Sequence, residues 1–323
     1  MESISKFCHQ ISKNLPANIK ITNGLGEGSY GNVYKIYDTN TNKHSALKVY
    51  KFSNQEEGIP ATTLKEIMLL KYLNQKQIKN IVEIEKIYIN LNSIYMQMEF
   101  CDSDLFHFIY QKDYSDEGTF NLILKYMKQI LSATYQMHLA GVMHRDLKPA
   151  NIFIKNGEIK IGDFGLSRTY SLPGQNYSTS VCTLWYKAPE LFGQFGYYSP
   201  AIDIWSIGCI FCEMLCKQPI FCGRTKGKEE YETIKKIIQF CGNFTKDQSV
   251  LPGNQFMSFS DTFDDCPSKD IFINALFNYL HSHSFFNISS DIFDLIIRML
   301  VADPTKRISC LDALNHPLFV NII

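Results

Sequence analysis

One stretch decides how the chain folds: Val142-Met-His-Arg-Asp-Leu-Lys-Pro-Ala-Asn-Ile-Phe-Ile-Lys-Asn-Gly-Glu-Ile-Lys-Ile-Gly-Asp-Phe-Gly165. The β-branched runs on either side of its Asn-Gly turn predict a β-hairpin with strands over 151–155 and 158–161. A hairpin brings Asn151 and Asp163 towards each other at its open end. Both side chains carry oxygen atoms that suit a hard cation such as Mg²⁺, so these two residues are candidate metal ligands.

An acidic side chain, Asp146, precedes the hairpin. It lies close enough to Asn151 in the chain to reach a hydroxyl group held beside the same cation. An alternative interpretation is a polar loop with solvated carboxylates, followed by an ordinary hairpin. The quoted stretch combines many characteristic residue types at fixed separations along the chain. That combination favours the interpretation as a reactive site.

Composition limits the possible classes of protein. The 323 residues are 45% hydrophobic and 20% charged, which is typical of a folded globular chain with a substantial core. Lys plus Arg and Asp plus Glu each number 32, so the net charge gives no indication of direct binding to nucleic acid or to a membrane. No apolar run has the length of a signal peptide core or of a membrane span. We therefore expect an intracellular protein, located in the nucleus, the cytoplasm or both.

The ten cysteines show no spacing typical of a secreted disulfide scaffold, so we expect reduced thiols. Cys209, Cys212 and Cys216 would lie on one side of an apolar helix. A zinc site would require a second pair at a defined spacing, so small buried hydrophobic residues are the favoured interpretation. The His281-Ser-His283 segment indicates a polar loop rather than a metal site.

The glycines of Gly26-Glu-Gly-Ser-Tyr-Gly31 lie between two expected strands, 19–25 and 32–38. A dinucleotide-binding fingerprint would require a helix after the glycines. The β-branched and aromatic residues that follow predict a strand instead, which favours a glycine loop that covers phosphate groups.

Lys48 lies in the middle of an apolar strand expected over 44–50. A buried lysine needs an anionic partner. The candidates are nucleotide phosphates and Glu66, on a helix expected over 62–73. The alternative is a lysine that extends from the strand to the surface. A pair between strand and helix would act as a switch, because a movement of the helix breaks it.

The remaining patterns predict a small β-rich part followed by a larger helical part, an α+β fold without internal repeats. Two further strands are expected over 83–89 and 93–100, and helices over 121–140, 200–216, 227–241, 270–280, 290–300 and 309–315. Residues 243–269 indicate an insertion loop.

From Ile19 to Phe319 the chain resembles a eukaryotic protein kinase, and within that superfamily the proline-directed cyclin-dependent kinases. The resemblance rests on the stretch quoted above, on the glycine loop, on Glu57-Gly-Ile-Pro-Ala-Thr-Thr-Leu-Lys-Glu-Ile67, on Thr183-Leu-Trp-Tyr-Lys-Ala-Pro-Glu190 and on the late insertion. Lys148-Pro-Ala-Asn151 and the 201–211 segment are most similar to the transcription-associated, Mediator-type members.

The resemblance implies a two-lobed kinase fold, with an N-lobe over 19–100 and a C-lobe over 101–319, preceded by an extension over 1–18 and followed by 320–323. It implies transfer of phosphate from ATP, with Mg²⁺, to Ser or Thr of a protein. Asp146 would accept the hydroxyl proton and Lys148 would neutralise charge on the transferring group. Lys48, held by Glu66, would position the phosphates.

Further residues are assigned by the resemblance. The ATP-binding residues would be Leu25, Gly26, Glu27, Gly28, Ser29, Tyr30, Gly31, Val33, Ala46, Lys48, Met98, Glu99, Cys101 and Asp104. Structural roles would fall to Glu190 with Arg307 as its ion-pair partner, and to Asp203.

The resemblance also implies regulatory sites. Ser178, or Thr179 next to it, would be the activating phosphorylation site, with Lys65, Arg145 and Arg168 as the phosphate-binding cations. An unmodified polar loop is the alternative. Ser29 and Tyr30 fall on inhibitory positions. A cyclin-like activating subunit would contact the helix within residues 60–73, and without it we expect that helix to be displaced.

Two residues depart from the family pattern. Lys65 and Lys187 each replace an arginine, and an ammonium group does not grip phosphate as a planar guanidinium does. Lys187 stands at the position tied to a preference for Pro after the phosphorylated residue.

Two rival classes of protein are disfavoured by the sequence. A pseudokinase scaffold would lack a catalytic Lys, Asp or Asn, and a P-loop NTPase would carry Gly-Lys-Ser/Thr after the glycines.

Overall fold

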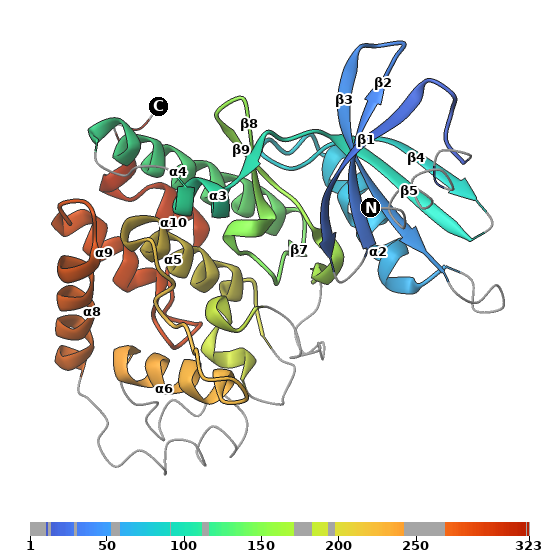
Figure 1. Cartoon of the computed structure of the whole chain (residues 1–323). Coiled ribbons are helices and arrows are strands. Elements are labelled where there is room, and N and C mark those ends of the chain that lie inside the picture. Colours follow the sequence, from blue (N-terminus) through green and yellow to red (C-terminus); the bar gives the residue numbers. More distant parts are fainter. Residues whose placement is uncertain are drawn as a thin grey trace. The chain divides into compact units, whose positions relative to one another are not determined.

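The structure is a computed structural model of the whole chain (Figure 1). It describes residues 11, 14–28, 31–52, 59–90, 92–111, 116–170, 183–192, 198–241, 269–320 and 322. The chain divides into two compact units, Met1–Ser103 with Phe153–Gly165, and Asp104–Ile152 with Leu166–Ile323. A β-rich unit followed by a mainly helical one is the α+β class that the sequence predicts.

The first unit is built on a five-stranded antiparallel sheet with the strand order β1-β2-β3-β5-β4. Its strands are β1 (Ile19–Gly28), β2 (Gly31–Asp38), β3 (Lys43–Lys51), β4 (Ile84–Asn90) and β5 (Ser93–Glu99). Lys48 on the central strand β3 lies opposite Val33 on β2 and Met96 on β5. Residues directly opposite each other in antiparallel strands share a face of the sheet. The register therefore fixes which side chains accompany Lys48.

Helix α2 (Ala61–Gln75) follows β3 and begins directly after Pro60, which cannot donate a helical hydrogen bond and suits a helix start. It is slightly longer at both ends than the expected 62–73. Its buried side includes Glu66, Ile67, Leu70 and Leu73. This inward side places a carboxylate among apolar side chains.

The extension at the N-terminus contributes to the core of the first unit. Ile11 and Leu15 are buried in a cluster with side chains of the sheet, namely Ile19, Tyr34, Ile36, Leu47, Val49 and Tyr95. The Asn14 amide donates a hydrogen bond to the Tyr95 hydroxyl at 3.0 Å. Residues before the first strand thus cover one face of the sheet.

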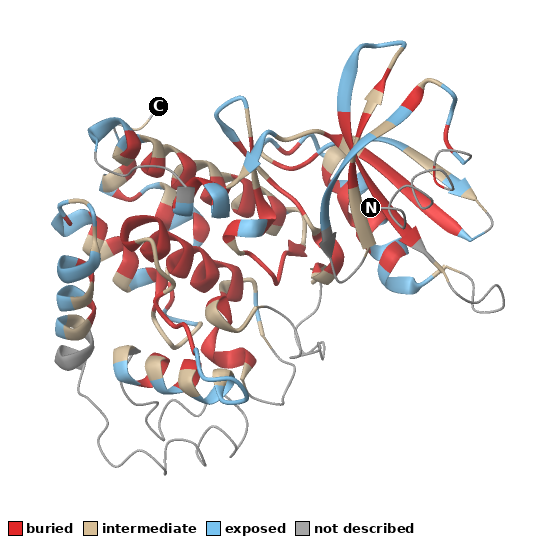
Figure 2. Ribbon diagram, viewed as in Figure 1, coloured by how far each residue is buried: buried red, intermediate tan, exposed pale blue. Residues whose placement is uncertain are grey.

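The second unit consists mainly of helices. They are α3 (Leu105–Gln111), α4 (Glu117–Leu139), α5 (Ala201–Cys216), α6 (Glu229–Cys241), α8 (Lys269–His283), α9 (Ser290–Met299) and α10 (Cys310–Leu314). Residues 202–216 of α5 are all buried, as the red ribbon of Figure 2 shows. A helix that is apolar on all sides belongs in the centre of a helical unit. Cys209, Cys212 and Cys216 are buried there as free thiols, as predicted.

Two helix boundaries differ from the expectation. Helix α4 begins four residues before position 121, because the Asp116 carboxylate caps it by accepting the Thr119 N–H at 2.6 Å. The prediction of a polar loop at His281-Ser-His283 is wrong. These residues continue α8, where both imidazole rings stack on aromatic rings one turn earlier.

The predicted hairpin consists of β8 (Ile152–Lys155) and β9 (Glu158–Ile161), in a three-stranded sheet with β6 (Ser103–Asp104). Asn156 and Gly157 both have positive φ, of 51° and 74°, which is the left-handed turn that Asn-Gly favours. A second short pair is formed by β7 (Val142–Met143) and β10 (Arg168–Thr169). Within the described residues, no helix is both long enough and apolar enough to span a bilayer.

Candidate active site

In the first unit, three of the predicted site residues come together. The Lys48 Nζ lies 2.6 Å from Oε1 of Glu66 and 3.0 Å from Oδ1 of Asp163. Lys48 and Glu66 are both buried, with 10% and 3% of their side chains exposed. The ammonium group therefore lies between two carboxylates, one from helix α2 and one from the segment after β9. The predicted strand–helix pair is formed, and α2 is therefore not displaced in this structure.

Burial and charge oppose each other at this pair. Burial alone would lower the pKa of Lys48, but the negative charges of Glu66 and Asp163 outweigh it and the pKa is raised. Burial raises the pKa of Glu66, and the charge of Lys48 opposes that shift. Lys48 is thus held in its cationic form, which is the form that phosphate groups require.

The predicted adenine contacts lie on the same face of the sheet as Lys48. Ala46 is two residues before Lys48 and lies opposite Met98, and Val33 lies opposite Lys48 itself. Ala46 is buried, whereas Leu25 on β1 is 47% exposed. The structure thus gives this face small and apolar side chains next to a buried cation.

Gly31 ends the glycine loop, and both its backbone conformation and its close neighbour require a residue without a Cβ atom. Its φ is +147°, and a Cβ on it would lie 2.4 Å from the Val49 carbonyl oxygen. Gly26 pairs with Val33, and the backbones of Glu27 and Gly28 end β1. Ser29 and Tyr30 lie outside the described residues.

Contacts of Glu99, the last residue of β5, hold the start of the predicted linker in place. Its buried carboxylate accepts hydrogen bonds from Lys155 at 2.7 Å and from the Glu83 N–H at 2.9 Å, and it pairs with Lys160 at 2.8 Å. Burial would raise the pKa of Glu99, but these donors outweigh it and the pKa is lowered. The sequence indicated the position of this linker but not the two lysines that hold it.

Two other predicted ATP-binding residues follow Glu99. Burial raises the pKa of Cys101 to about 12, so this thiol stays protonated. Asp104, in the second unit, begins α3 by accepting the His107 N–H at 2.7 Å.

The second unit brings together another group around Asp146. Oδ2 of Asp146 accepts hydrogen bonds from Lys148 Nζ at 2.8 Å and from the Asn151 amide at 3.0 Å. Oδ1 accepts the Thr183 N–H at 3.1 Å, and Lys148 also reaches the Thr183 hydroxyl at 3.0 Å. Thr183 was quoted in a sequence motif, but its contact with a residue so distant in sequence could not be inferred from spacing. The carboxylate is thereby fixed on both oxygens.

Asn151 and Asp163 each carry oxygen atoms of the kind that a hard cation binds. Asn151 donates its amide nitrogen to the Asp146 backbone oxygen at 2.8 Å as well as to its carboxylate. This orients the amide oxygen, an atom that Mg²⁺ prefers, away from Asp146. Asp163 supplies a carboxylate, with a positive φ of 58° that a non-glycine residue rarely adopts. Asn151 directly precedes β8 and Asp163 follows β9; the two residues belong to different units, so their approach to each other as joint metal ligands stays a prediction.

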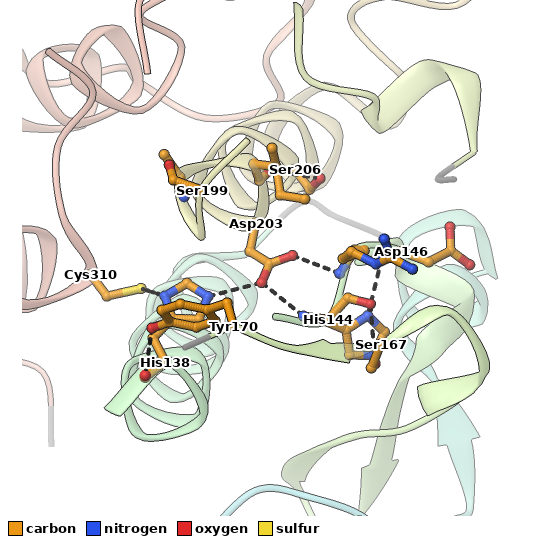
Figure 3. A network of polar contacts seen from close by, with 12 residues as sticks. His138, His144, Asp146, Ser167, Tyr170, Ser199, Asp203, Ser206 and Cys310 are labelled. Carbon is orange, nitrogen blue, oxygen red and sulfur yellow. Dashed lines mark hydrogen bonds and ion pairs between the residues drawn. The ribbon is translucent and has the colours of Figure 1, made fainter. Parts of the chain in front are cut away.

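Asp203 supports the segment that carries Asp146 (Figure 3). It is fully buried on α5 and accepts three hydrogen bonds at 2.9 Å, from the His138 ring and from the N–H groups of His144 and Arg145. Figure 3 shows the carboxylate between the helix that carries His138 and the strand end before Asp146. Since Arg145 has an unusual positive φ of 69°, this carboxylate holds a bend that the chain would not otherwise adopt.

Glu190 and Arg307 form the predicted ion pair. Two parallel contacts of 2.7 and 2.9 Å join the guanidinium to the carboxylate, and at most 1% of either side chain is exposed. Arg307 also donates to the backbone oxygens of Val301 and Ala201. Such a bidentate pair anchors the Ala-Pro-Glu segment to the helical unit.

The predicted phosphate-binding cations differ in exposure. Lys65 is exposed on α2 in the first unit. In the second unit, Arg145 is buried and donates to the Leu166 oxygen at 2.7 Å and to the Tyr198 hydroxyl, and Arg168 donates to the Ser167 oxygen. Ser178 and Thr179 lie outside the described residues, so their role stays a prediction.

Comparison with known proteins identifies the class. Residues 19–319 match the protein kinase domain family, so the chain belongs to the protein kinase family. It is similar to cyclin-dependent kinase C-2 of rice, Oryza sativa subsp. japonica, with 34% identity over 314 residues that cover 91% of this chain and 58% of the relative. This similarity agrees with the resemblance to cyclin-dependent kinases. The chain spans about three fifths of the length of this curated relative. Kinases of this family use ATP and Mg²⁺, the predicted cofactors.

Proposed function

We propose that this chain is an active serine/threonine kinase of the cyclin-dependent type, which transfers the γ-phosphoryl group of ATP to a hydroxyl group of a protein. The observation that carries the proposal is the arrangement around Asp146. A buried carboxylate bonded on both oxygens, with a lysine 2.8 Å away, is positioned as a base rather than solvated as a surface charge. A protein that only binds nucleotide would not need Lys148 and Thr183 at this carboxylate.

Each residue then has one task. When bound, Mg²⁺ and ATP supply the phosphoryl group and neutralise the charge that develops on it. Asp146 orients the substrate hydroxyl and accepts its proton, a role worth about 10²–10⁴-fold in rate. Lys148 is positioned to stabilise negative charge on the transferring group. Lys48, fixed by Glu66, holds the α- and β-phosphates, while Asn151 and Asp163 would hold the metal.

We further propose a cyclin-like activating subunit that docks on α2. Leu64, Met68 and Tyr72 follow one another at four-residue spacing and are 40%, 68% and 37% exposed. Residues four apart lie on the same side of a helix, so the three form an outward apolar stripe, called the α2 stripe below. The opposite side of the same helix carries Glu66. A partner on the stripe therefore acts on the helix that positions Lys48.

Substrates with Pro after the phosphorylated residue are proposed from the sequence resemblance, with Lys187 as the residue to examine. Lys187 is buried, lies 3.6 Å from Glu230 on α6 and places its Nζ 4.5 Å from the ring centroid of Phe192. A positive charge is thus retained at this position, although lysine replaces the arginine of the family pattern. We propose cell-cycle or transcription control in the nucleus or cytoplasm as the setting.

The test is phosphate transfer from labelled ATP to paired Ser-Pro and Ser-Ala peptides, by the chain alone and with the subunit that copurifies from its native cell. Wild type is expected to label Ser-Pro preferentially and more strongly with the subunit, and Asp146→Asn to lose activity by about 10²–10⁴-fold. Absence of transfer under both conditions would refute the enzyme and favour a nucleotide-binding scaffold. Equal labelling of both peptides would leave a kinase without proline direction.

A further inference from the structure

Tyr50 lies beside the Lys48–Glu66 pair, but the proposed chemistry leaves it without a task. It follows Lys48 by two positions on β3, so both side chains lie on the same face of the sheet. The Lys48 Nζ lies 5.4 Å from the centroid of the Tyr50 ring. Only 2% of Tyr50 is exposed. The ring thus forms part of the immediate surroundings of the ion pair.

The Tyr50 hydroxyl is a buried polar group without a hydrogen-bond partner among the described residues. A buried hydroxyl in that state is destabilising, whereas phenylalanine would fill the same space without this penalty. Other tyrosines of the chain show the usual solution. Tyr110 and Tyr186 both donate to the carboxylate of Glu213, at 2.6 and 2.7 Å. The unpartnered hydroxyl of Tyr50 therefore needs a reason.

Glu66 is the candidate acceptor for this hydroxyl, because its Oε1 lies 2.6 Å from the same Lys48 Nζ that lies 5.4 Å from the Tyr50 ring centroid. The electrostatics of the two groups agree with this assignment. Burial raises the pKa of Tyr50 strongly, and the negative charge of Glu66 raises it further. In turn, burial raises the pKa of Glu66, while Lys48 and the Tyr50 hydroxyl both act to lower it. Because Tyr50 stays neutral, it can only donate a proton to a hydrogen bond with this carboxylate. Lys48 uses Oε1 of Glu66, and a carboxylate accepts several donors.

We propose that Tyr50 is a positioning residue for the Lys48–Glu66 pair, a second donor that holds the Glu66 carboxylate, and with it helix α2, in place. The inference rests on the proposed function, since it assigns Tyr50 to ATP binding through Lys48. A neutral donor suits this task because it stabilises Glu66 without competing with the phosphates for Lys48. The α2 stripe is exposed, so inward contacts of this kind keep the helix in place before a partner binds.

The test compares Tyr50→Phe with Tyr95→Phe in the full chain. Tyr95 is the matched control, since it is equally buried in the neighbouring strand but lies opposite Val49, on the other face of the sheet. Its hydroxyl is bonded to Asn14 and Ser93 at 3.0 Å. Binding of a fluorescent ATP analogue, amide hydrogen exchange across 61–75 and the melting temperature are measured for each protein.

For Tyr50→Phe we expect about tenfold weaker ATP binding and about tenfold faster exchange in α2, because a hydrogen bond to a charged group is lost. The melting temperature should fall as well, since that hydrogen bond stabilises the folded chain. Tyr95→Phe should lower the melting temperature and leave ATP binding unchanged. If Tyr50→Phe exchanges α2 amides and binds ATP like wild type, Tyr50 is only a core residue and the inference is wrong. Amide exchange in α2 requires neither ATP nor turnover, so it tests the role of Tyr50 by itself. Failure of the wild-type chain to bind ATP would refute the proposed function, and the exchange result would still decide the inference about Tyr50.

Discussion

Replacement of Asp203 by Asn changes one oxygen atom to an amide group at the centre of the second unit. The carboxylate accepts two hydrogen bonds on Oδ2, from His138 and the His144 N–H, and one on Oδ1, from the Arg145 N–H. An asparagine has only one acceptor oxygen. If this oxygen replaces Oδ2, the new amide faces the Arg145 N–H as donor against donor. The variant keeps the size of the side chain but cannot satisfy its neighbours.

The magnitude follows from these three contacts. The orphaned N–H costs about 1–3 kcal/mol, and the two retained bonds each lose about 1 kcal/mol because they no longer involve a charge. We therefore expect Asp203→Asn to lower the free energy of unfolding by about 3–5 kcal/mol, the range for a broken buried pair. Activity should fall as well, since the same bonds hold the bend before Asp146.

Urea unfolding at neutral pH measures this loss, with Asp294→Asn as the control. Asp294 also accepts a hydrogen bond from a histidine, His316 at 3.0 Å, but 45% of its side chain is exposed, against 1% for Asp203. Exposed pairs contribute about 0–1 kcal/mol. Similar losses for the two variants would contradict the reasoning, because burial would then not set the contribution of the carboxylate.

The pH dependence provides an independent check. Burial alone would raise the pKa of Asp203, but the His138 bond and the backbone donors outweigh it, and the pKa is lowered. A carboxyl group with a lowered pKa in the folded state stabilises the protein above its usual pKa, and that contribution is lost as pH falls through the lowered value. The stability difference between wild type and Asp203→Asn should therefore shrink below about pH 4.

Three further substitutions test the site and its supports. Gly31→Ala should abolish ATP binding in a titration and lower the melting temperature, because the new Cβ meets a backbone oxygen at 2.4 Å; Gly157→Ala, with open space around it, should cost only about 1–2 kcal/mol. Thr183→Val removes a hydroxyl but keeps the backbone donor, so kcat should fall about tenfold while the KM for ATP is unchanged, in steady-state assays. Arg307→Lys cannot reproduce the two-pronged contact with Glu190 and should lower the free energy of unfolding by about 3 kcal/mol in urea; a loss below about 1 kcal/mol would show that the second contact is dispensable.

Local patterns were sufficient for most of the fold. The five strands, helix α2 and the β8–β9 hairpin are all present, because alternation and an Asn-Gly turn determine such elements over a few residues. The start of α4 was missed because Gly118 weakens the helical pattern just after the Asp116 cap. A cap followed by a poor helix former gives two conflicting local signals.

Contacts between residues distant in sequence were harder to predict. The Lys48–Glu66 pair was predicted because a lysine in an apolar strand demands a partner and a helix with a carboxylate follows. No comparable requirement points from Asp146 to Thr183, or from Glu99 to Lys155 and Lys160. Their polar side chains would be equally stable in water, so only the folded chain shows that they meet.

Helix α2 faces inward with Glu66 and outward with the α2 stripe, and this division makes its partner surface testable. Met68 is 68% exposed, so Met68→Glu should change the stability of the chain by no more than about 0.5 kcal/mol. In an apolar interface, however, the new carboxylate would lose its water, so we expect binding of the copurified subunit to weaken at least about 100-fold. Thr62→Glu adds the same charge on the same helix, away from the stripe, and should bind almost as well as wild type. Surface plasmon resonance with the purified subunit compares the two. If both variants bind equally, the partner does not dock on the stripe; if both bind weakly, charge near α2 rather than burial of Met68 controls the association.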